Sequence, residues 1–243
     1  MSEVELYEAN AERRRALAVV AHPDDIDFGM AGTIARLTGD GVAVAYCLVT
    51  SGDAGGDSST TTNEERARER EAEQTAAAAE LGVRDLTFLH YPDGRVEVTL
   101  DLRRDIARVI RRWRPDLVLT QNPERNWERI FASHPDHLAA GEATLRAVYP
   151  DARNPHAFPE LLSEGLEPHV VPEVWVGGGV NGFAVDITDT VERKLAALKR
   201  HVSQVGGRED LDEMVRAWAS ATADAAGLAS GRFAEGFRRV VTA

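Results

Sequence analysis

Two short segments, far apart in the chain, carry the side chains best suited to chemistry. The segments His22-Pro23-Asp24-Asp25 and His134-Pro135-Asp136-His137 each place imidazole and carboxylate groups beside a turn-forming proline. A catalytic zinc ion usually takes three protein ligands from His, Asp or Glu and keeps one position open for water. The two segments therefore predict a metal site with a general base and a general acid beside it.

The ligands that we predict from these segments are His22, Asp25 and His137. A spacing of three residues lets the side chains of His22 and Asp25 converge within one turn after a strand. The third ligand, His137, would come from the start of a helix that follows Pro135. Two imidazoles and one carboxylate suit Zn²⁺, and another divalent ion such as Fe²⁺ also uses this set.

The remaining polar side chains of the two segments predict catalytic roles. Asp24 stays free beside the metal and is predicted to be the general base toward the attacking water. His134 lies one helical turn before His137 and is predicted to be the general acid or to stabilise the oxyanion. Asp136 would hold one ring in a single tautomer, either that of His134 or that of a ligand histidine.

Apolar runs predict the elements that position these residues. The run Ala16–Ala21 is typical of a buried parallel strand that delivers His22 to the end of a sheet, where ligands bind in open α/β folds. Helix candidates alternate with strand candidates after it. The predicted strands are Leu17–Ala21, Val42–Thr50, Leu86–Leu89, Leu117–Thr120, Glu173–Val176 and Ala184–Ile187. The predicted helices are Ala31–Thr38, Glu64–Leu81, Leu100–Trp113, Leu138–Tyr149, Glu192–His201 and Asp210–Ala226.

This alternation predicts an α/β fold class. We expect a Rossmann-like three-layer fold, in which helices flank a mostly parallel sheet, plus a C-terminal helical segment. One domain is expected over residues 1–243, with an N-terminal extension at 1–15 and the helical segment at 205–243. The Gly-, Ser- and Thr-rich segment Ser51–Asn63 follows the second predicted strand. It is predicted to be a loop at the ligand-bearing edge, either a mobile flap or a plain surface loop.

Composition narrows the class of partner. The formal charge of -12 disfavours a nucleic acid, because phosphate binding needs excess Lys and Arg. The basic run at 103–114 has apolar residues at helical spacing, which is typical of an amphipathic helix with a solvated face. The single cysteine, Cys47, lies in an apolar run and is predicted to be a buried, inert thiol. With no disulfide and no apolar run of membrane-spanning length, we expect a cytoplasmic enzyme with no membrane partner.

With these residues in place, the chain resembles the PIG-L/LmbE family of zinc-dependent N-deacetylases. The strings Ala21–Asp25, Gly32-Thr33-Ile34 and His134–His137 carry the resemblance. It extends over most of the chain, to Thr50–Gly55, Arg70–Glu73, Leu81-Gly82-Val83, Tyr91–Gly94 and Val185–Thr188, and to Lys194, His201 and Gln204. The family's zinc ligands match His22, Asp25 and His137, its base matches Asp24, and its acid matches His134 supported by Asp136.

The resemblance implies a zinc-dependent amidohydrolase that removes the N-acetyl group from an N-acetylglucosamine-type small molecule or conjugate, a linear amide. Asp53, Arg70 and Asp93 match positions where similar members contact the sugar. The residues alone leave another interpretation open, in which Arg70 pairs with Glu73 or Glu80 and the two aspartates are turn residues. Members of the family often form dimers, trimers or hexamers, so a homo-oligomer stays open as well.

The chain departs from the family pattern at two positions. The first motif usually continues with an acidic residue directly after its second Asp, but Ile26 stands there and Asp27 follows. Some members carry a tyrosine two residues before the acid histidine, where this chain has Ala132. Another donor would then have to stabilise the oxyanion, and Asn122, Asn126 and Trp127 are the candidates.

Three other functions compete with the deacetylase. A metal-containing sugar-binding module without hydrolysis would keep the fold but is expected to lack Asp24 or a ligand. An amidase that cleaves a mycothiol-type conjugate would use the same chemistry on a related substrate. A dinucleotide-dependent enzyme is disfavoured, because no Gly-x-Gly-x-x-Gly string follows a strand and Asp24 and Asp25 would repel a pyrophosphate.

Overall fold

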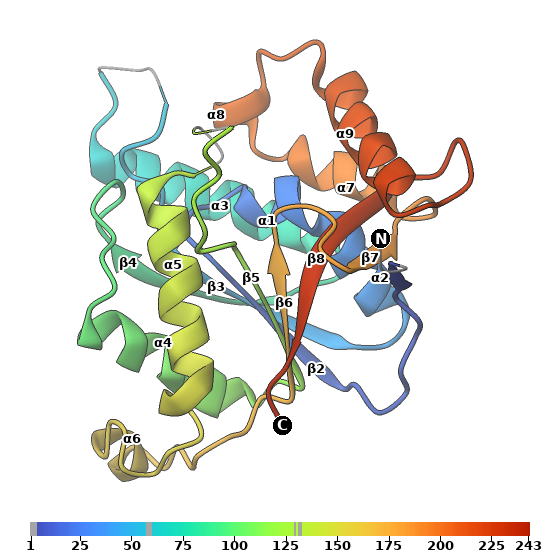
Figure 1. Cartoon of the computed structure of the whole chain (residues 1–243). Helices are drawn as coiled ribbons and strands as arrows, with labels where there is room; N and C mark the ends of the chain where they lie inside the picture. Colours follow the sequence, from blue (N-terminus) through green and yellow to red (C-terminus); the bar gives the residue numbers. More distant parts are fainter. Residues whose placement is uncertain (1–3, 57–59, 129, 131–132) are drawn as a thin grey trace.

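An eight-stranded sheet forms the centre of the computed structural model, which describes residues 4–56, 60–128, 130 and 133–243 (Figure 1). The strands are β1 (Glu5–Leu6), β2 (Arg15–Val20), β3 (Ala43–Thr50), β4 (Asp85–Tyr91), β5 (Leu117–Thr120), β6 (Glu173–Gly177), β7 (Phe183–Asp186) and β8 (Ala234–Val241). The helices are α1 (Asp25–Gly29), α2 (Ala31–Gly39), α3 (Asn63–Glu80), α4 (Leu100–Trp113), α5 (Pro135–Arg146), η2 (Ala147–Asp151), α6 (Glu160–Ser163), α7 (Val191–Leu198), α8 (Val202–Val205) and α9 (Leu211–Ala225).

The strand order is β1-β7-β8-β6-β5-β2-β3-β4. Strand β2 lies between β3 and β5 and is parallel to both, with Ala16 opposite Val44 and Leu117. Strand β8 runs antiparallel to its neighbours β6 and β7. The carboxyl ends of the parallel strands therefore meet at one edge, the upper edge of Figure 1, and α5 begins at the same edge. The predicted α/β fold with a mostly parallel sheet is confirmed.

Alternate side chains of each buried strand pack against different helix layers. Ala16, Ala18 and Val20 of β2 belong to a core cluster that includes residues of α2, α3 and α7. Leu17 and Val19 face the other way and pack in a cluster with residues of α4 and α5. A strand buried on both faces must be apolar at every position, which is why the sequence of β2 shows no alternation.

Side-chain caps mark the starts of α3, α4 and α5. The Thr62 side chain accepts a hydrogen bond from the Glu65 N–H, and the Glu65 carboxylate accepts one from the Thr62 N–H, so this capping box starts α3 at Asn63.

The predicted helix Leu138–Tyr149 is wrong at both ends. Pro135 starts α5 three residues earlier, and α5 ends at Arg146 before a π-helical turn in which Tyr149 has extended dihedrals. A residue that precedes a proline avoids the helical region, and Pro150 follows.

The ends of the chain differ from the prediction. The predicted helical segment at 205–243 contains α9, but its last part is the eight-residue strand β8. Within the predicted N-terminal extension at 1–15, Glu5 and Leu6 pair with Phe183 and Ala184 as the short strand β1. Strand β8 carries Gly236 and two arginines, so its sequence lacks the β-branched pattern that marks the other strands.

The basic run is only partly the solvated face that we predicted. Arg103 pairs with Asp151, and Arg108 pairs with Glu164. Arg111 is buried and donates hydrogen bonds to backbone carbonyls of the segment after α5. This side chain ties α4 to the irregular chain that leads toward β6.

The interior cysteine behaves as predicted. Cys47 is fully buried in β3, and burial raises the pKa of its thiol to about 12. Its thiol is therefore protonated and inert at neutral pH. None of the helices in the described ranges is both long and apolar enough to cross a membrane.

A buried ion pair joins the C-terminal strand to the helices near the ligand-bearing edge. The Lys194 Nζ atom lies 2.6 Å from Glu235 Oε1, and both side chains are 5% exposed. Glu235 also accepts hydrogen bonds from the N–H groups of Gly32 and Thr33 in the first turn of α2. Lys194 also donates to the Phe28 carbonyl. Strand β8 and α7 therefore fix the junction between α1 and α2.

We expect Glu235→Ala to lower the free energy of unfolding by about 3–5 kcal/mol, because it leaves Lys194 buried without its partner. The matched control is Asp212→Ala, since the Asp212 pair with Lys199 is about half exposed and should contribute less than about 1 kcal/mol. Urea unfolding followed by circular dichroism measures both values. Equal losses in the two variants would contradict this interpretation of the buried pair.

Candidate active site

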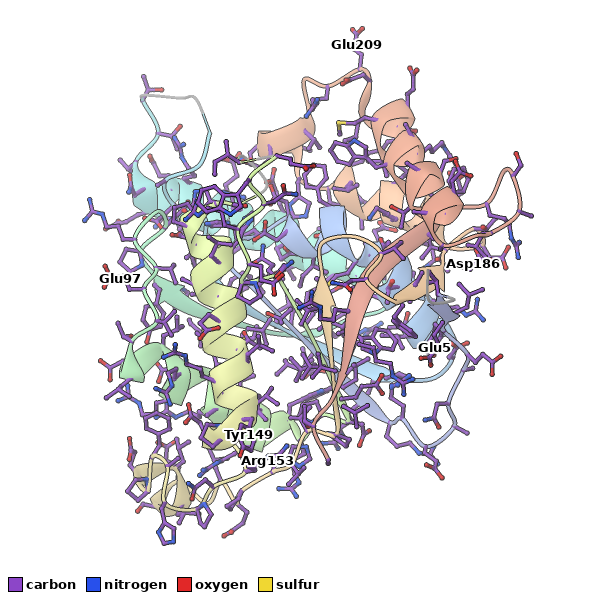
Figure 2. The ribbon with its side chains drawn as sticks, in the orientation of Figure 1. Glu5, Glu97, Tyr149, Arg153, Asp186 and Glu209 are labelled. Carbon is purple, nitrogen blue, oxygen red and sulfur yellow. The ribbon has the colours of Figure 1, made fainter. Side chains whose placement is uncertain are left out.

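The two predicted segments meet at the carboxyl ends of β2 and β5. His22 follows β2, and the backbone of Ala21 is held on both sides, by the Gln121 side chain that follows β5 and by the Thr50 N–H at the end of β3. Helix α5 starts beside this point (Figure 1). The chain just beyond its lower end carries Tyr149 and Arg153, which are labelled in Figure 2 on the side of the molecule away from this edge.

Close packing of α5 against the end of β5 positions the second segment. A Cβ atom at Gly141 would lie 2.4 Å from the Gln121 carbonyl oxygen, so only glycine allows this approach. Gly141 lies one helical turn after His137 on the same face of α5. The close approach therefore brings the ring of His137 toward β2 and His22.

His22 is nearly buried, and its two ring nitrogens face different partners. The Nδ1 atom lies 3.3 Å from Asp25 Oδ2 and 3.2 Å from His137 Nε2. The Nε2 atom lies 3.0 Å from Asp93 Oδ1 and 3.2 Å from Asp136 Oδ2. Burial alone would lower the pKa of His22, but its hydrogen bonds to Asp136, Asp25 and Asp93 raise it to about 12. The ring thus occupies a strongly negative environment.

The donor atoms of His22, Asp25 and His137 form a compact triangle. The third contact joins His137 Nε2 to the other carboxylate oxygen of Asp25, Oδ1, over 3.0 Å. Three ligands of a tetrahedral ion at zinc bond lengths lie about 3.3 Å from one another, so the triangle fits such an ion. Although burial opposes its charge, His137 and His22 hold the pKa of Asp25 well below its ordinary value. Asp25 is therefore ionised at the point where the three predicted ligands converge.

Two other groups of candidate ligands share His22. Nitrogens of His22, His134 and His137 lie within 4.8 Å of one another, as do donor atoms of His22, Asp93 and Asp136. The carboxylate of Asp136 is already held by the N–H groups of Gly94 and Val96, at 2.7 and 3.2 Å. It is therefore placed to orient His22 from behind. The set with Asp25 combines two imidazoles with one carboxylate, as catalytic zinc sites do, whereas the Asp136 carboxylate of the second group is already engaged by backbone N–H groups.

Asp24 lies beside this triangle in an unusual backbone conformation. Its φ angle of 88° is in the left-handed region, which few non-glycine residues adopt. The carboxylate lies 3.3 Å from the Arg70 guanidinium. Burial and the neighbouring charge of Asp25 raise the pKa of Asp24 to about 7, although Arg70 opposes the shift. A carboxylate with this pKa is suited to take up and release a proton near neutral pH.

His134 caps the start of α5 with its own ring. Its Nδ1 atom accepts a hydrogen bond from the Asp136 N–H over 3.2 Å, so the neutral ring carries its proton on Nε2. Burial and the nearby rings of His22 and His137 lower the pKa of His134. The structure therefore offers a neutral imidazole with a free N–H donor. The Asp136 carboxylate lies on His22, not on His134, so the predicted support of His134 by Asp136 comes only from the backbone N–H.

The three predicted substrate contacts surround the same edge. Asp93 contacts His22 and accepts a hydrogen bond from the Ala54 N–H, and Asp53 accepts one from the Asp93 N–H. Arg70 is buried and contacts Asp24, and the structure pairs Glu73 with Ser203. The alternative in which Arg70 pairs with Glu73 or Glu80 is therefore wrong.

The loop after β3 rests on Arg70. Arg70 Nη1 donates to the Gly52 carbonyl over 3.1 Å, and Gly52 has a φ of 66°. A Cβ atom there would lie 2.3 Å from Arg70 Nη1, so the loop needs glycine at this position. Residues 57–59 of the predicted flap lie outside the described residues, and its closure stays a prediction.

The sequence assigned no role to Gln74, Asp27 or His201, which form a buried hydrogen-bonded chain behind Asp24. The available signals were the acid displaced to position 27 and the place of His201 in the family pattern.

Ala132 lies outside the described residues. Of its predicted substitutes, Asn122 and Asn126 accept hydrogen bonds from the N–H groups two residues further on, and Trp127 is 82% exposed.

Comparison with known proteins identifies the class. The family model described as GlcNAc-PI de-N-acetylase (PIG-L) matches residues 17–148. A diacetylchitobiose deacetylase from Thermococcus kodakarensis is 35% identical over 93% of this chain and 83% of its own length. A 1D-myo-inositol 2-acetamido-2-deoxy-alpha-D-glucopyranoside deacetylase from Kineococcus radiotolerans is 29% identical over 84% of this chain and 72% of its own.

A solved structure agrees with this assignment. The N,N'-diacetylchitobiose deacetylase of Pyrococcus horikoshii, in complex with an inhibitor, superposes with a TM-score of 0.85 at 30% identity, over 95% of this chain and 85% of that one. The fold and site thus define a deacetylase, an amidohydrolase of N-acetyl groups. The chain belongs to the PIG-L family, and the predicted family and enzyme class are confirmed.

His137→Ala should lower the affinity for zinc by more than about 100-fold, because it removes one side of the donor triangle. The matched control is His169→Ala, which removes a half-buried histidine that donates to the Pro115 carbonyl. Metal per chain, measured by mass spectrometry after dialysis, should be near one in the control and near zero in His137→Ala. Full metal content in both would show that His137 is no ligand.

Proposed function

We propose that this protein is a zinc-dependent hydrolase that removes the acetyl group from the nitrogen of an N-acetylglucosamine unit in a small molecule or conjugate. The single observation that carries the proposal is the donor triangle of His22, Asp25 and His137 with Asp24 and His134 beside it. The family's deacetylases and the fit of the donors to a tetrahedral ion support it.

The reaction breaks the amide C–N bond with water and yields acetate and a free amine. When bound in the triangle, the metal supplies a Lewis acid that lowers the pKa of a water molecule to about 7 and polarises the acetyl carbonyl. Asp24 accepts the proton that the water loses as it attacks the carbonyl carbon. Because burial keeps the pKa of Asp24 high, the carboxyl group can hold this proton until the amine departs.

His134 and His22 have different tasks in this scheme. The His134 N–H at Nε2 donates a hydrogen bond to the carbonyl oxygen as negative charge develops on it, and the proton that Asp24 holds passes to the departing amine nitrogen. Asp93 and Asp136 accept a hydrogen bond from the His22 Nε2–H, which would leave the Nδ1 lone pair to hold the metal. Asp136 thereby acts through His22.

Sugar recognition is proposed for the side of the site that carries Asp53. A cavity of about 240 Å³ lies there, lined in part by Ser51, Asp53, Asn63 and His90. These polar side chains suit the hydroxyl groups of a sugar ring. The relatives act on a disaccharide and on an inositol glycoside, so the shared feature is the acetylated glucosamine. The cytoplasmic location and a homo-oligomer stay predictions.

Asp24→Asn should retain zinc and lower kcat by about 100-fold or more, because asparagine keeps the shape and the left-handed backbone but cannot accept the proton. KM should change little. Steady-state kinetics on zinc-loaded protein measure both constants, and metal analysis of the same sample shows that the site is intact. Activity equal to that of the wild type would remove Asp24 from the role of base.

The zinc-loaded protein should release acetate from at least one sugar that carries N-acetylglucosamine. The panel contains N,N'-diacetylchitobiose, N-acetylglucosamine and its inositol glycoside, with N-acetylalanine as the control that lacks a sugar. A bimane conjugate of mycothiol tests the amidase alternative, since cleavage of its cysteinyl amide releases no acetate. Bound metal with no product from any compound would favour the sugar-binding module over the enzyme.

A further inference from the structure

Two side chains of α3 bind the two polar groups of the Pro23-Asp24 peptide. Arg70 Nη2 donates to the Pro23 carbonyl over 2.6 Å. Gln74 Oε1 accepts a hydrogen bond from the Asp24 N–H over 2.9 Å. Because Arg70 and Gln74 are four residues apart, they lie on the same face of the helix. One helix face therefore fixes the orientation of this single peptide.

This peptide needs to be held. Asp24 has a left-handed backbone conformation, which costs free energy for any residue with a Cβ atom and persists only where the surroundings enforce it. No side-chain hydrogen bond caps α1 at Asp24, so its carboxylate does not bind the first N–H groups of the helix. Rotation of the Pro23-Asp24 peptide would turn the carboxylate away from the triangle.

A buried chain behind Gln74 sets the orientation of its amide. Gln74 is fully buried, and its Nε2 donates to Asp27 Oδ2 over 2.9 Å. The same oxygen lies 2.8 Å from His201 Nε2, and Asp27 and His201 are both fully buried. With its amide nitrogen bound to Asp27, Gln74 can present only its oxygen to Asp24. His201 comes from the segment between α7 and α8, far from Asp24 in the sequence.

A contribution to stability alone does not explain the hydrogen-bonded chain of Gln74, Asp27 and His201. Among the described residues, Asp27 Oδ1 and His201 Nδ1 are buried without a hydrogen-bond partner. A buried acid and imidazole with one unsatisfied atom each stabilise a fold less than apolar side chains of the same size. The arrangement is explained if Asp27 and His201 fix the position of Gln74, at a cost in the free energy of folding.

We propose that Gln74 is a positioning residue for the general base, which it holds through the Asp24 N–H, and that Asp27 and His201 act behind it to orient its amide. This inference rests on the proposed function, since it needs Asp24 to be the base. It also accounts for the acid that stands at position 27 in place of 26, because Asp27 serves Gln74 and His201 from the buried side of α1.

The first test is a double-variant cycle on the zinc-loaded protein. Gln74→Met keeps the volume of the side chain but removes both hydrogen bonds, and it should lower kcat by about 10- to 100-fold with KM changed less than about twofold. In the Asp24→Asn background the same change should lower kcat by less than about twofold, because the base that Gln74 positions is already gone. Losses that multiply in the double variant would overturn the inference.

His201 gives the second arm. His201→Leu removes the hydrogen bond to Asp27 and should lower kcat, whereas His201→Gln keeps an N–H donor and should recover most of the loss. The matched control, His169→Leu, removes a half-buried histidine that bonds the Pro115 carbonyl and should leave kcat unchanged. If His201→Leu and His201→Gln were equally impaired, or if only thermal stability fell, His201 would have no part in orienting Gln74.

A crystal structure of zinc-loaded Gln74→Met separates this inference from the proposed function. The inference expects zinc in place and the Asp24 φ angle out of the left-handed region. An unchanged Asp24 peptide would overturn it, whatever the activity. A wild-type protein that binds zinc but hydrolyses no compound would sink the proposed function, and the geometry of Asp24 in the variant would still decide whether Gln74 positions it.

Discussion

The concentration of carboxylates around one imidazole is the constraint on which the site depends. Asp25, Asp93 and Asp136 all lie within 3.3 Å of a nitrogen of His22, and Asp24 adds a fourth carboxylate beside them. Ionised groups packed this closely in a nearly buried place repel one another unless positive charge lies between them. Without a metal, the raised pKa of His22 supplies that charge as a proton. A divalent ion held at Nδ1 would supply more, and the His22 Nε2–H would still donate to Asp93 and Asp136.

The fold meets this constraint because β2 lies in the middle of a parallel sheet. Its neighbours β3 and β5 end at the same edge, and each holds the backbone of Ala21 with one hydrogen bond. His22 therefore leaves the sheet from a point fixed on both sides, and the glycine contact of α5 fixes His137 against it. A ligand pair from sequence-distant segments needs this rigidity, since a shift of about 1 Å in one donor weakens the whole set.

Much of this arrangement follows from the sequence, because local patterns mark both the central strands and the site. Unbroken apolar runs mark the central strands, and β5 and α4 have the predicted bounds, with α4 ending before Pro115. The histidines and carboxylates beside prolines mark the site. Strand β8 escapes prediction because its pairing with β6 and β7 depends on tertiary contacts, not on its own pattern. The roles of Gln74 and His201 cannot be predicted for the same reason, since they depend on tertiary contacts and no sequence spacing links these residues to Asp24.

Arg70 shows how burial changes what a charged residue does. From the sequence, a helical arginine with glutamates three or more positions away predicts an exposed pair, which would contribute only a few tenths of a kcal/mol. The structure buries Arg70 under the Gly52 loop, where its two terminal nitrogens serve the Pro23 and Gly52 carbonyls and the Asp24 carboxylate.

Little of the guanidinium therefore remains for a sugar. A carboxylate has about four lone-pair sites, so Asp53 keeps acceptor capacity after bonding the Asp93 N–H and Asn63, and Asp93 keeps it after bonding the Ala54 N–H and His22. Of the three substrate contacts predicted from the family pattern, the two aspartates are thus the ones that the geometry leaves available for hydroxyl groups, and Arg70 belongs with the residues that hold the base.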